Sequence, residues 1–236
     1  MKNSNKHVYF LGLFILLCFQ VKGQSQYAVV LGGGYSTLER PFYNGGSWEM
    51  LKGMALIESG ASIYGNFGNE RKTGWQVGLM IQSSGFQSIP IDMDKINEDR
   101  PPGSSPVINP AEAPRDYKNA YRKRNWGFTA PVSFTYSVFE PIVLFLGPEF
   151  QYSLTSFPEK DKWKINNRGY LDPRFKNFNI MGHLGLFADV GPNIRIAGKV
   201  FSDIIPRLNY HHIEGDQIEK GYRQMGFSLQ VSYSIN

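Results

Sequence analysis

Six titratable side chains recur among small polar residues at alternating positions of this chain. They are Glu58, Glu149, His183, Asp189, Arg195 and Lys199. Two chemistries fit such a set: a path for protons or ions, and a group of ion pairs that fills an interior. Charges in a narrow interior must be paired or hydrated. We therefore expect these side chains to form an ion-pair plug in a narrow lumen, which has room for packed side chains but hardly for a solute.

A second charged set is basic and lies between the alternating segments. Its members are Arg122, Lys123, Arg124, Arg168, Arg174 and Lys176. Arginine forks pair well with phosphate oxygens. The set predicts either a contact with the phosphates of lipopolysaccharide or a solvated rim that keeps the loops out of lipid.

Metal sites find little support in the sequence. The adjacent His211 and His212 would point to opposite sides of a strand. Asp92 and Asp94 are followed by Ile96, which breaks the spacing of a calcium loop. We expect neither a metal site nor a cofactor.

Enzyme chemistry is also weakly supported. Some small outer-membrane barrels modify lipid A with a Ser-His pair near the outer rim, but no serine lies two residues from His183. Residues distant in sequence could still meet in the fold. We expect no catalytic residues and no enzyme activity.

The elements that position these side chains are predicted to be strands, and the C-terminal segment is the clearest. From Met225 to Ile235 every odd position is apolar and every even position is small or polar. Alternation with a period of two gives a strand one apolar and one polar face. A polar face without charges favours lipid on one side and a narrow packed lumen on the other.

Seven earlier segments alternate in the same way, at about 27–36, 53–64, 75–82, 126–138, 142–154, 178–190 and 194–200. Pro131 interrupts the fourth, where we expect a bulge. The connections are alternately long and short, and the long ones are about 37–52, 87–121, 156–176 and 203–221. This rhythm is typical of short periplasmic turns and long extracellular loops. The sequence predicts an all-β, membrane-spanning, antiparallel up-and-down β-barrel of about eight strands.

Aromatic residues gather near both ends of the predicted strands. We place Tyr27, Tyr64, Trp75, Tyr136, Phe139 and Tyr233 at periplasmic ends, and Tyr35, Phe86, Tyr152, Phe178 and Tyr222 near outer ends. Two aromatic belts at the two interfaces are typical of a barrel in lipid. A soluble all-β barrel or sandwich remains the alternative. In such a fold the apolar side chains would face the core, and the surface would consist mostly of small polar residues with few charges.

The first residues predict export. Lys2 and Lys6 precede the apolar run from Val8 to Phe19, and cleavage is expected near Gly23. We divide the chain into a signal peptide, 1–23, and an outer-membrane β-barrel domain, 24–236. Three of the 25 Lys and Arg residues lie in 1–23, which leaves 22 against 20 Asp and Glu. This near balance gives no argument for nucleic acid as a partner.

Four features carry a family resemblance: the predicted export signal, the glycine-rich first strand, Leu146-Gly147-Pro148-Glu149-Phe150 and the segment Gly226 to Tyr233. Together they resemble the PorT-like outer-membrane β-barrel family of small Gram-negative barrels. The resemblance implies a small outer-membrane barrel without an assigned molecular activity. It also implies that the chain could serve as an accessory part of protein-export machinery, as some members of that family do.

The sequence therefore favours a structural or interaction role in the outer membrane. The outer loops, above all 87–121, are expected to bind a partner or surface lipid, including lipopolysaccharide. The alternatives are a subunit of a larger export or assembly complex, a narrow pore and a lipid-modifying enzyme.

Overall fold

Eight long strands dominate the computed structural model, which describes residues 25–39, 43–44, 47–48, 50–67, 72–98, 112–118, 120–154, 164–166, 169–173, 177–212 and 218–235. These strands are β1 (Gln26–Leu38), β4 (Met50–Asn66), β5 (Thr73–Ile89), β6 (Tyr121–Phe139), β7 (Ile142–Ser153), β10 (Phe178–Asp189), β11 (Ile194–Asp203) and β14 (Gln224–Ile235). The expected signal peptide, 1–23, lies outside the described residues and stays a prediction.

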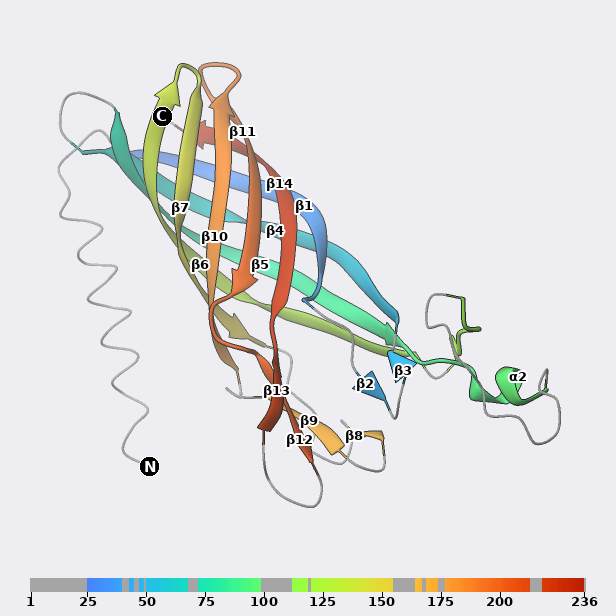
Figure 1. Cartoon of the computed structure of the whole chain (residues 1–236). Coiled ribbons are helices and arrows are strands. Elements are labelled where there is room, and N and C mark those ends of the chain that lie inside the picture. The colour runs from blue at the N-terminus through green and yellow to red at the C-terminus, as the bar shows by residue number, and fades with distance from the viewer. Residues whose placement is uncertain are drawn as a thin grey trace, which may run out of the picture.

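The eight strands close into one barrel in the order β1-β14-β11-β10-β7-β6-β5-β4 (Figure 1). Each long strand pairs with the preceding and following long strands, and every pairing is antiparallel. The first and last strands complete the circle, from Tyr27 opposite Ile235 to Leu38 opposite Gln224. The predicted eight-stranded up-and-down barrel is confirmed.

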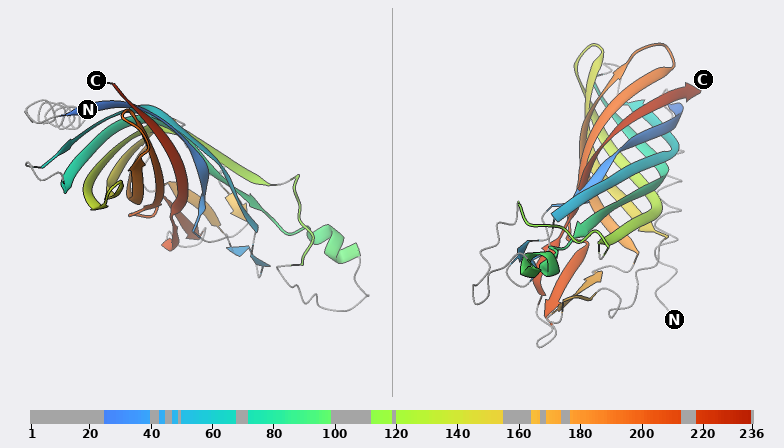
Figure 2. Two further views of the ribbon diagram at one scale, coloured as in Figure 1. Left: turned by 90° about the horizontal axis from the view of Figure 1, so that it is seen from above. Right: turned by 90° about the vertical axis from the view of Figure 1, so that its right-hand side faces the viewer.

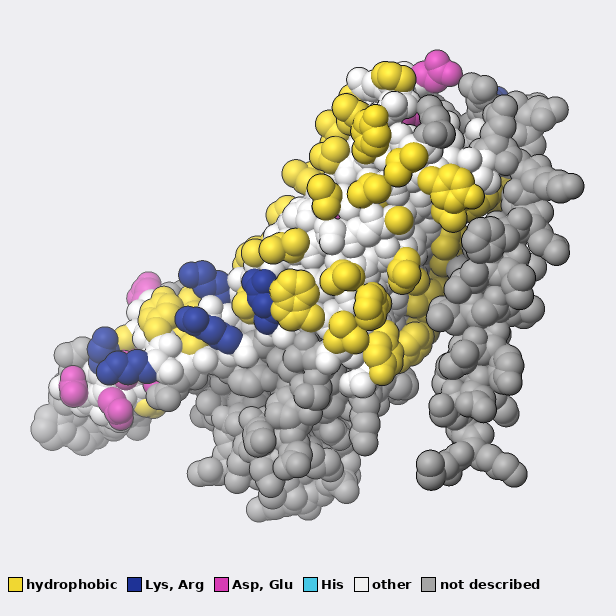
Figure 3. Space-filling view, turned by 180° about the vertical axis from the view of Figure 1, so that it is seen from behind, with side chains coloured by type: hydrophobic (Ala, Val, Ile, Leu, Met, Phe, Trp, Pro, Cys, Tyr) yellow, Lys and Arg dark blue, Asp and Glu magenta, His cyan; other side chains and the backbone are white. Residues whose placement is uncertain are grey.

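The alternation of each strand separates an apolar outer wall from a polar interior. In β14, Leu229 is 64% exposed, whereas its neighbour Ser228 is 1% exposed. The same division holds in β7, where Tyr152 faces outward and Glu149 and Gln151 are buried. Apolar side chains cover the outer wall, as Figure 3 shows for one face of the barrel. The arrangement reverses that of a soluble protein, in which large apolar side chains pack inside.

Most of the predicted belt aromatics lie on the outer wall. The strongly exposed ones are Tyr27, Tyr35, Tyr136, Phe139, Tyr152, Phe178 and Tyr233, and Trp75 is half-buried on the same side. Three others lie at the predicted ends but do not belong to the belts on the outer wall. Tyr64 points into the lumen, where its hydroxyl lies 2.5 Å from Ser234 Oγ. Phe86 is buried on the inner face of β5, and Tyr222 is buried in β13 (Ile218–Tyr222).

The bulge expected at Pro131 is absent. Val77 pairs with Val132 and Met80 with Thr129, so the register runs through Pro131 without an inserted residue. The facing residue is Gly78, whose added Cβ would lie 3.1 Å from Pro131 Cγ. The missing side chain of Gly78 therefore makes room for the proline ring within a regular ladder.

A bulge occurs instead in β4, between Gly53 and Ile57. The residues between them pair with β1 but are absent from the ladder with β5. Ser36 of β1 fills the gap, because its Oγ accepts from the Gly85 amide and donates to the Gly85 carbonyl, both at 2.8 Å. Beyond this bulge β4, β5 and β6 continue together as a three-stranded extension of the barrel.

The long connections contain structure that the alternation did not reveal. A four-stranded sheet of order β13-β12-β9-β8 contains β8 (Lys164–Asn166), β9 (Gly169–Pro173) and β12 (Leu208–His212), and a short hairpin joins β2 (Tyr43–Asn44) to β3 (Ser47–Trp48). The predicted irregular stretch 87–121 begins later than expected, since β5 runs to Ile89. It also includes the helix α2 (Met93–Glu98), which lies on an arm that extends away from the barrel (Figure 2).

Asp92 accounts for the start of this helix, because its Oδ1 accepts from the Lys95 amide at 3.2 Å. An acidic side chain just before the first turn is a common helix cap. In the part of the chain that the structure describes, no helix has the length and apolar character needed to span a membrane.

Candidate functional site

Three charged side chains from three strands meet inside the barrel. The ammonium of Lys199, from β11, lies 3.2 Å from Glu58 Oε2 of β4 and 3.1 Å from Glu149 Oε2 of β7. Each residue occupies an inward position of its strand, and their side chains are at most 2% exposed. One ammonium thus bridges two carboxylates across the lumen.

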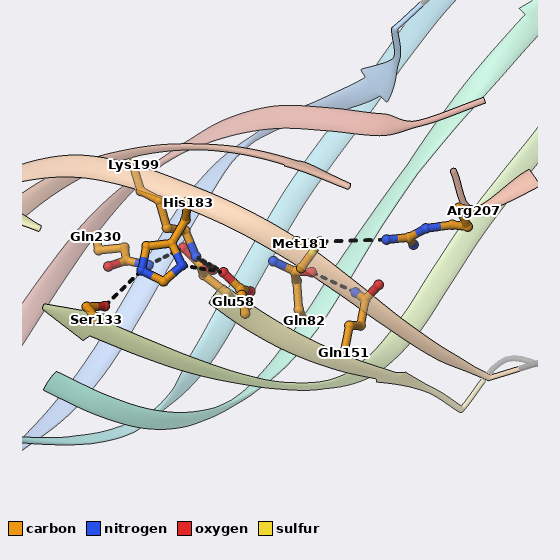
Figure 4. Close-up of polar contacts among 10 residues, drawn as sticks. Glu58, Gln82, Ser133, Gln151, Met181, His183, Lys199, Arg207 and Gln230 are labelled. Carbon is orange, nitrogen blue, oxygen red and sulfur yellow. Dashed lines mark hydrogen bonds and ion pairs between the residues drawn. The ribbon is translucent and has the colours of Figure 1, made fainter. Parts of the chain in front are cut away.

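Polar side chains from three further strands complete this Lys199 cluster (Figure 4). Gln230 Nε2 of β14 donates to Glu58 Oε1 at 2.7 Å. His183 of β10 places its Nδ1 3.8 Å from Glu149 Oε2, and its Nε2 lies 2.8 Å from Ser133 Oγ of β6. Six of the eight barrel strands therefore contribute to one buried group.

The remaining two predicted plug residues form a separate pair. Arg195 Nε lies 2.8 Å from Asp189 Oδ1, and its Nη2 lies 3.2 Å from Asp189 Oδ2. The guanidinium carbon also lies 4.2 Å from the ring centroid of Tyr64 and 3.8 Å from that of Phe187. This pair sits beside the short β10–β11 turn, where a two-pronged ion pair and two aromatic faces hold the arginine.

A third group, around Asp203, was missed from the sequence. Asp203 accepts hydrogen bonds from Arg207 Nη2 at 2.8 Å, from Arg207 Nε at 3.1 Å and from the backbone N–H of Gln224 at 2.8 Å. The Asn179 side-chain amide donates to it as well. Asp203 continues the inward positions of β11, so the alternation of that strand could have identified it. Arg207 lies after the end of the strand, where no alternation indicates which way a side chain points.

Apolar and neutral polar side chains fill the lumen around the charged groups. One cluster consists of Phe145, Phe187 and Ala197, and another of Leu56, Met181 and Phe201. Gln151 Nε2 donates to Gln82 Oε1 at 2.9 Å. The described interior is therefore a stack of packed side chains, as expected for a narrow barrel.

The structure describes only part of the predicted basic set. Arg122 is exposed on β6, and Arg124 is half-buried there. Lys123 lies between them in the strand, but its side chain falls outside the described residues. The other three members, Arg168, Arg174 and Lys176, fall outside the described residues entirely.

The structure describes the side chains of only one of the two metal candidates, Asp92 with Asp94. Within the described residues, no group of three or more His, Cys, Asp or Glu side chains could hold a metal ion. Asp92 caps α2, as shown above. His211 and His212 belong to β12, and their side chains fall outside the described residues.

Comparisons with known proteins give only a distant likeness. No family model and no curated protein matches the sequence. Ail of Yersinia pestis is similar in structure, with 10% identity over 89% of this chain and 99% of that one and a TM-score of 0.42. OprG of Pseudomonas aeruginosa shows 8% identity over 92% and 100%, with a TM-score of 0.39. A designed transmembrane β-barrel shows 8% identity over 89% and 95%, with a TM-score of 0.36. At this distance the likeness does not bear on ligand, activity or location.

Proposed function

We propose that this chain is an outer-membrane β-barrel protein with a structural or interaction role and no enzyme activity. The observation that supports this best is a closed barrel with an apolar outer wall and its charges paired inside. Only closed barrels and helices satisfy every backbone group in lipid. Exposed leucine, phenylalanine and tyrosine side chains around the whole wall match the hydrocarbon and its interfaces.

The connections support one orientation of the barrel. The turns that join β6 to β7 and β10 to β11 are short and lie at the end where β14 finishes (Figure 1). The long connections, with α2 and the four-stranded sheet, extend from the other end. Outer-membrane barrels place short turns in the periplasm and long loops outside. The outer connections are therefore the part that we propose binds a partner or surface lipid.

A heat-modifiable gel shift tests the proposed barrel in lipid. We expect the unboiled full-length protein, extracted from outer membranes, to run faster than the boiled protein, because a closed barrel resists detergent unfolding until heated. Electrophoresis of paired samples measures this shift. Identical mobility before and after boiling, or recovery of the protein in a soluble fraction, would contradict the proposal.

The packed lumen predicts a barrel that does not conduct. Pure protein in a planar bilayer is expected to show no stable channels on the nanosiemens scale, since the Lys199 cluster and the two apolar clusters fill the interior. Current recordings at neutral pH in potassium chloride measure this. Stable open channels from monodisperse protein would favour the narrow-pore alternative.

One observation favours a second role, that of an accessory subunit of an export or assembly complex. The arm that carries α2 extends well beyond the barrel (Figure 2). Such an arm suits contact with a neighbouring protein more than with the membrane that surrounds the barrel. Recovery of a defined stoichiometric complex from mild detergent would support this role over that of a lone barrel.

A further inference from the structure

We propose that the outer face of the β4–β6 extension binds the phosphates of a lipid A headgroup through Lys52, Arg122 and Arg124. This inference rests on the proposed outer-membrane location. It adds Lys52, which is distant in sequence from the arginines, and it specifies one face of one part of the wall. We call these three residues the basic row.

The strand register brings the basic row together. Lys52 of β4 pairs with Gln87 of β5, and Gln87 pairs with Arg122 of β6. Directly paired residues share a face of the sheet, and two strand spacings separate Lys52 and Arg122 by about 10 Å between Cα atoms. Both residues are exposed. Two cations thus stand side by side across three strands.

The shared face is the outer one. In β6, Arg122 and Arg124 occupy the same alternating positions as Trp126 and Phe128, which are 46% and 40% exposed on the apolar wall. In the barrel part of β4 the even-numbered side chains face inward. The bulge between Gly53 and Ile57 shifts this alternation by one residue, so the even-numbered Lys52 lies on the outer face.

The basic row begins where the aromatic belt ends. Arg124 lies two residues beyond Trp126, or about 7 Å along the strand, and Arg122 about 13 Å beyond it. Tyr35, a belt residue, accepts a hydrogen bond from the Gly53 amide at 2.5 Å, directly beside Lys52. Tyrosine and tryptophan mark the headgroup level of a bilayer. Figure 3 shows basic side chains where the apolar wall gives way to the arm.

Arg124 is held in place at this level. Its Nη1 donates to Ser83 Oγ at 3.1 Å, and its Nη2 donates to the Ala55 carbonyl at 3.4 Å, in the bulge of β4. A guanidinium has five N–H donors, so the remaining ones are available to a phosphate. Lys52 and Arg122 form no ion pair with any acid that the structure describes. Because the row continues a lipid-facing wall, a lipid phosphate suits it better than an acidic peptide.

The experiment uses the full-length protein and the double variant Lys52→Gln with Arg122→Gln. Arg124 is left intact because it supports the β4 bulge. Delipidated, folded barrels are titrated with bisphosphorylated lipid A and with dephosphorylated lipid A. We expect the double variant to bind bisphosphorylated lipid A about tenfold more weakly, on the scale of two partly exposed charge-assisted hydrogen bonds. The wild-type protein should show a similar preference for the phosphorylated form.

Lys72→Gln is the matched control, since Lys72 is exposed at the opposite end of the barrel, just before β5. It should bind like the wild type. Equal affinity of wild type and double variant, with both still heat-modifiable, would overturn the basic row and leave the barrel proposal intact. A wild type that shows no heat-modifiable shift would instead remove the proposed function. Loss of a co-purifying acidic protein, with lipid A binding unchanged, would also overturn the assignment to lipid.

Discussion

Replacing Lys199 with Met is expected to lower the free energy of unfolding by about 3–5 kcal/mol, the usual cost of breaking a buried ion pair from one side. The ammonium bridges Glu58 and Glu149, both with buried side chains. Without it, two carboxylates share a narrow interior with no cation between them. Urea unfolding of the barrel in lipid vesicles, followed by tryptophan fluorescence, measures the loss.

Neutralising the carboxylates should reverse this loss. The triple variant Lys199→Met, Glu58→Gln and Glu149→Gln keeps similar volumes, and a glutamine at position 58 can still accept the bond from Gln230. Buried ion pairs replaced as a whole by neutral groups are often no less stable. We expect most of the unfolding free energy to return. A triple variant as unstable as Lys199→Met alone would mean that packing, and not charge, explains the effect.

Asp203→Ala is expected to cost a similar amount, about 3–5 kcal/mol, because it leaves the buried Arg207 guanidinium without its carboxylate. The Gln224 amide and the Asn179 side chain lose their acceptor as well. The same urea titration measures this loss. Asp203 joins the ends of β11 and β14 to Arg207, so the variant should also weaken the junction between the barrel and the connection to β12.

Ser202→Ala provides the matched control for Asp203. Ser202 is the exposed neighbour on β11, and within the described residues its hydroxyl donates only to the Asp203 carbonyl, at 3.5 Å. Its removal should change stability by no more than about 0.5 kcal/mol. If Ser202→Ala and Asp203→Ala were equally destabilising, the buried carboxylate would not be the cause.

The barrel could be predicted because each strand separates two environments. Strands such as β14 and β7 alternate because apolar side chains face outward and small or polar ones face inward. This alternation alone assigned Glu149 and Lys199 to the lumen. It could not predict that the two side chains form an ion pair, because that contact depends on how far each strand is staggered in the closed barrel. The stagger also decides that Arg195 pairs with Asp189 rather than with the Lys199 cluster.

The bulge expected at Pro131 was a wrong prediction because it considered only the strand that contains the proline. The neighbouring strand provides Gly78, which has no side chain to clash with the ring of Pro131. Tyr64, Phe86 and Tyr222 lie at the predicted strand ends, but their assignment to the belts was wrong. The alternation of β5 already places Phe86 on the inner face. The strands of the four-stranded sheet are three to five residues long. Such short segments give alternation too little length to be recognised.

The bridge at Lys199 also constrains the order in which the barrel can assemble. Lys199 lies 141 residues after Glu58 and 50 residues after Glu149 in the chain. An insertion intermediate that held only β4 to β7 would carry both carboxylates into the bilayer before their ammonium arrived, at a large desolvation cost. Inserting β11 together with these strands would avoid that cost, whereas a chain truncated before β11 would leave both carboxylates without their ammonium.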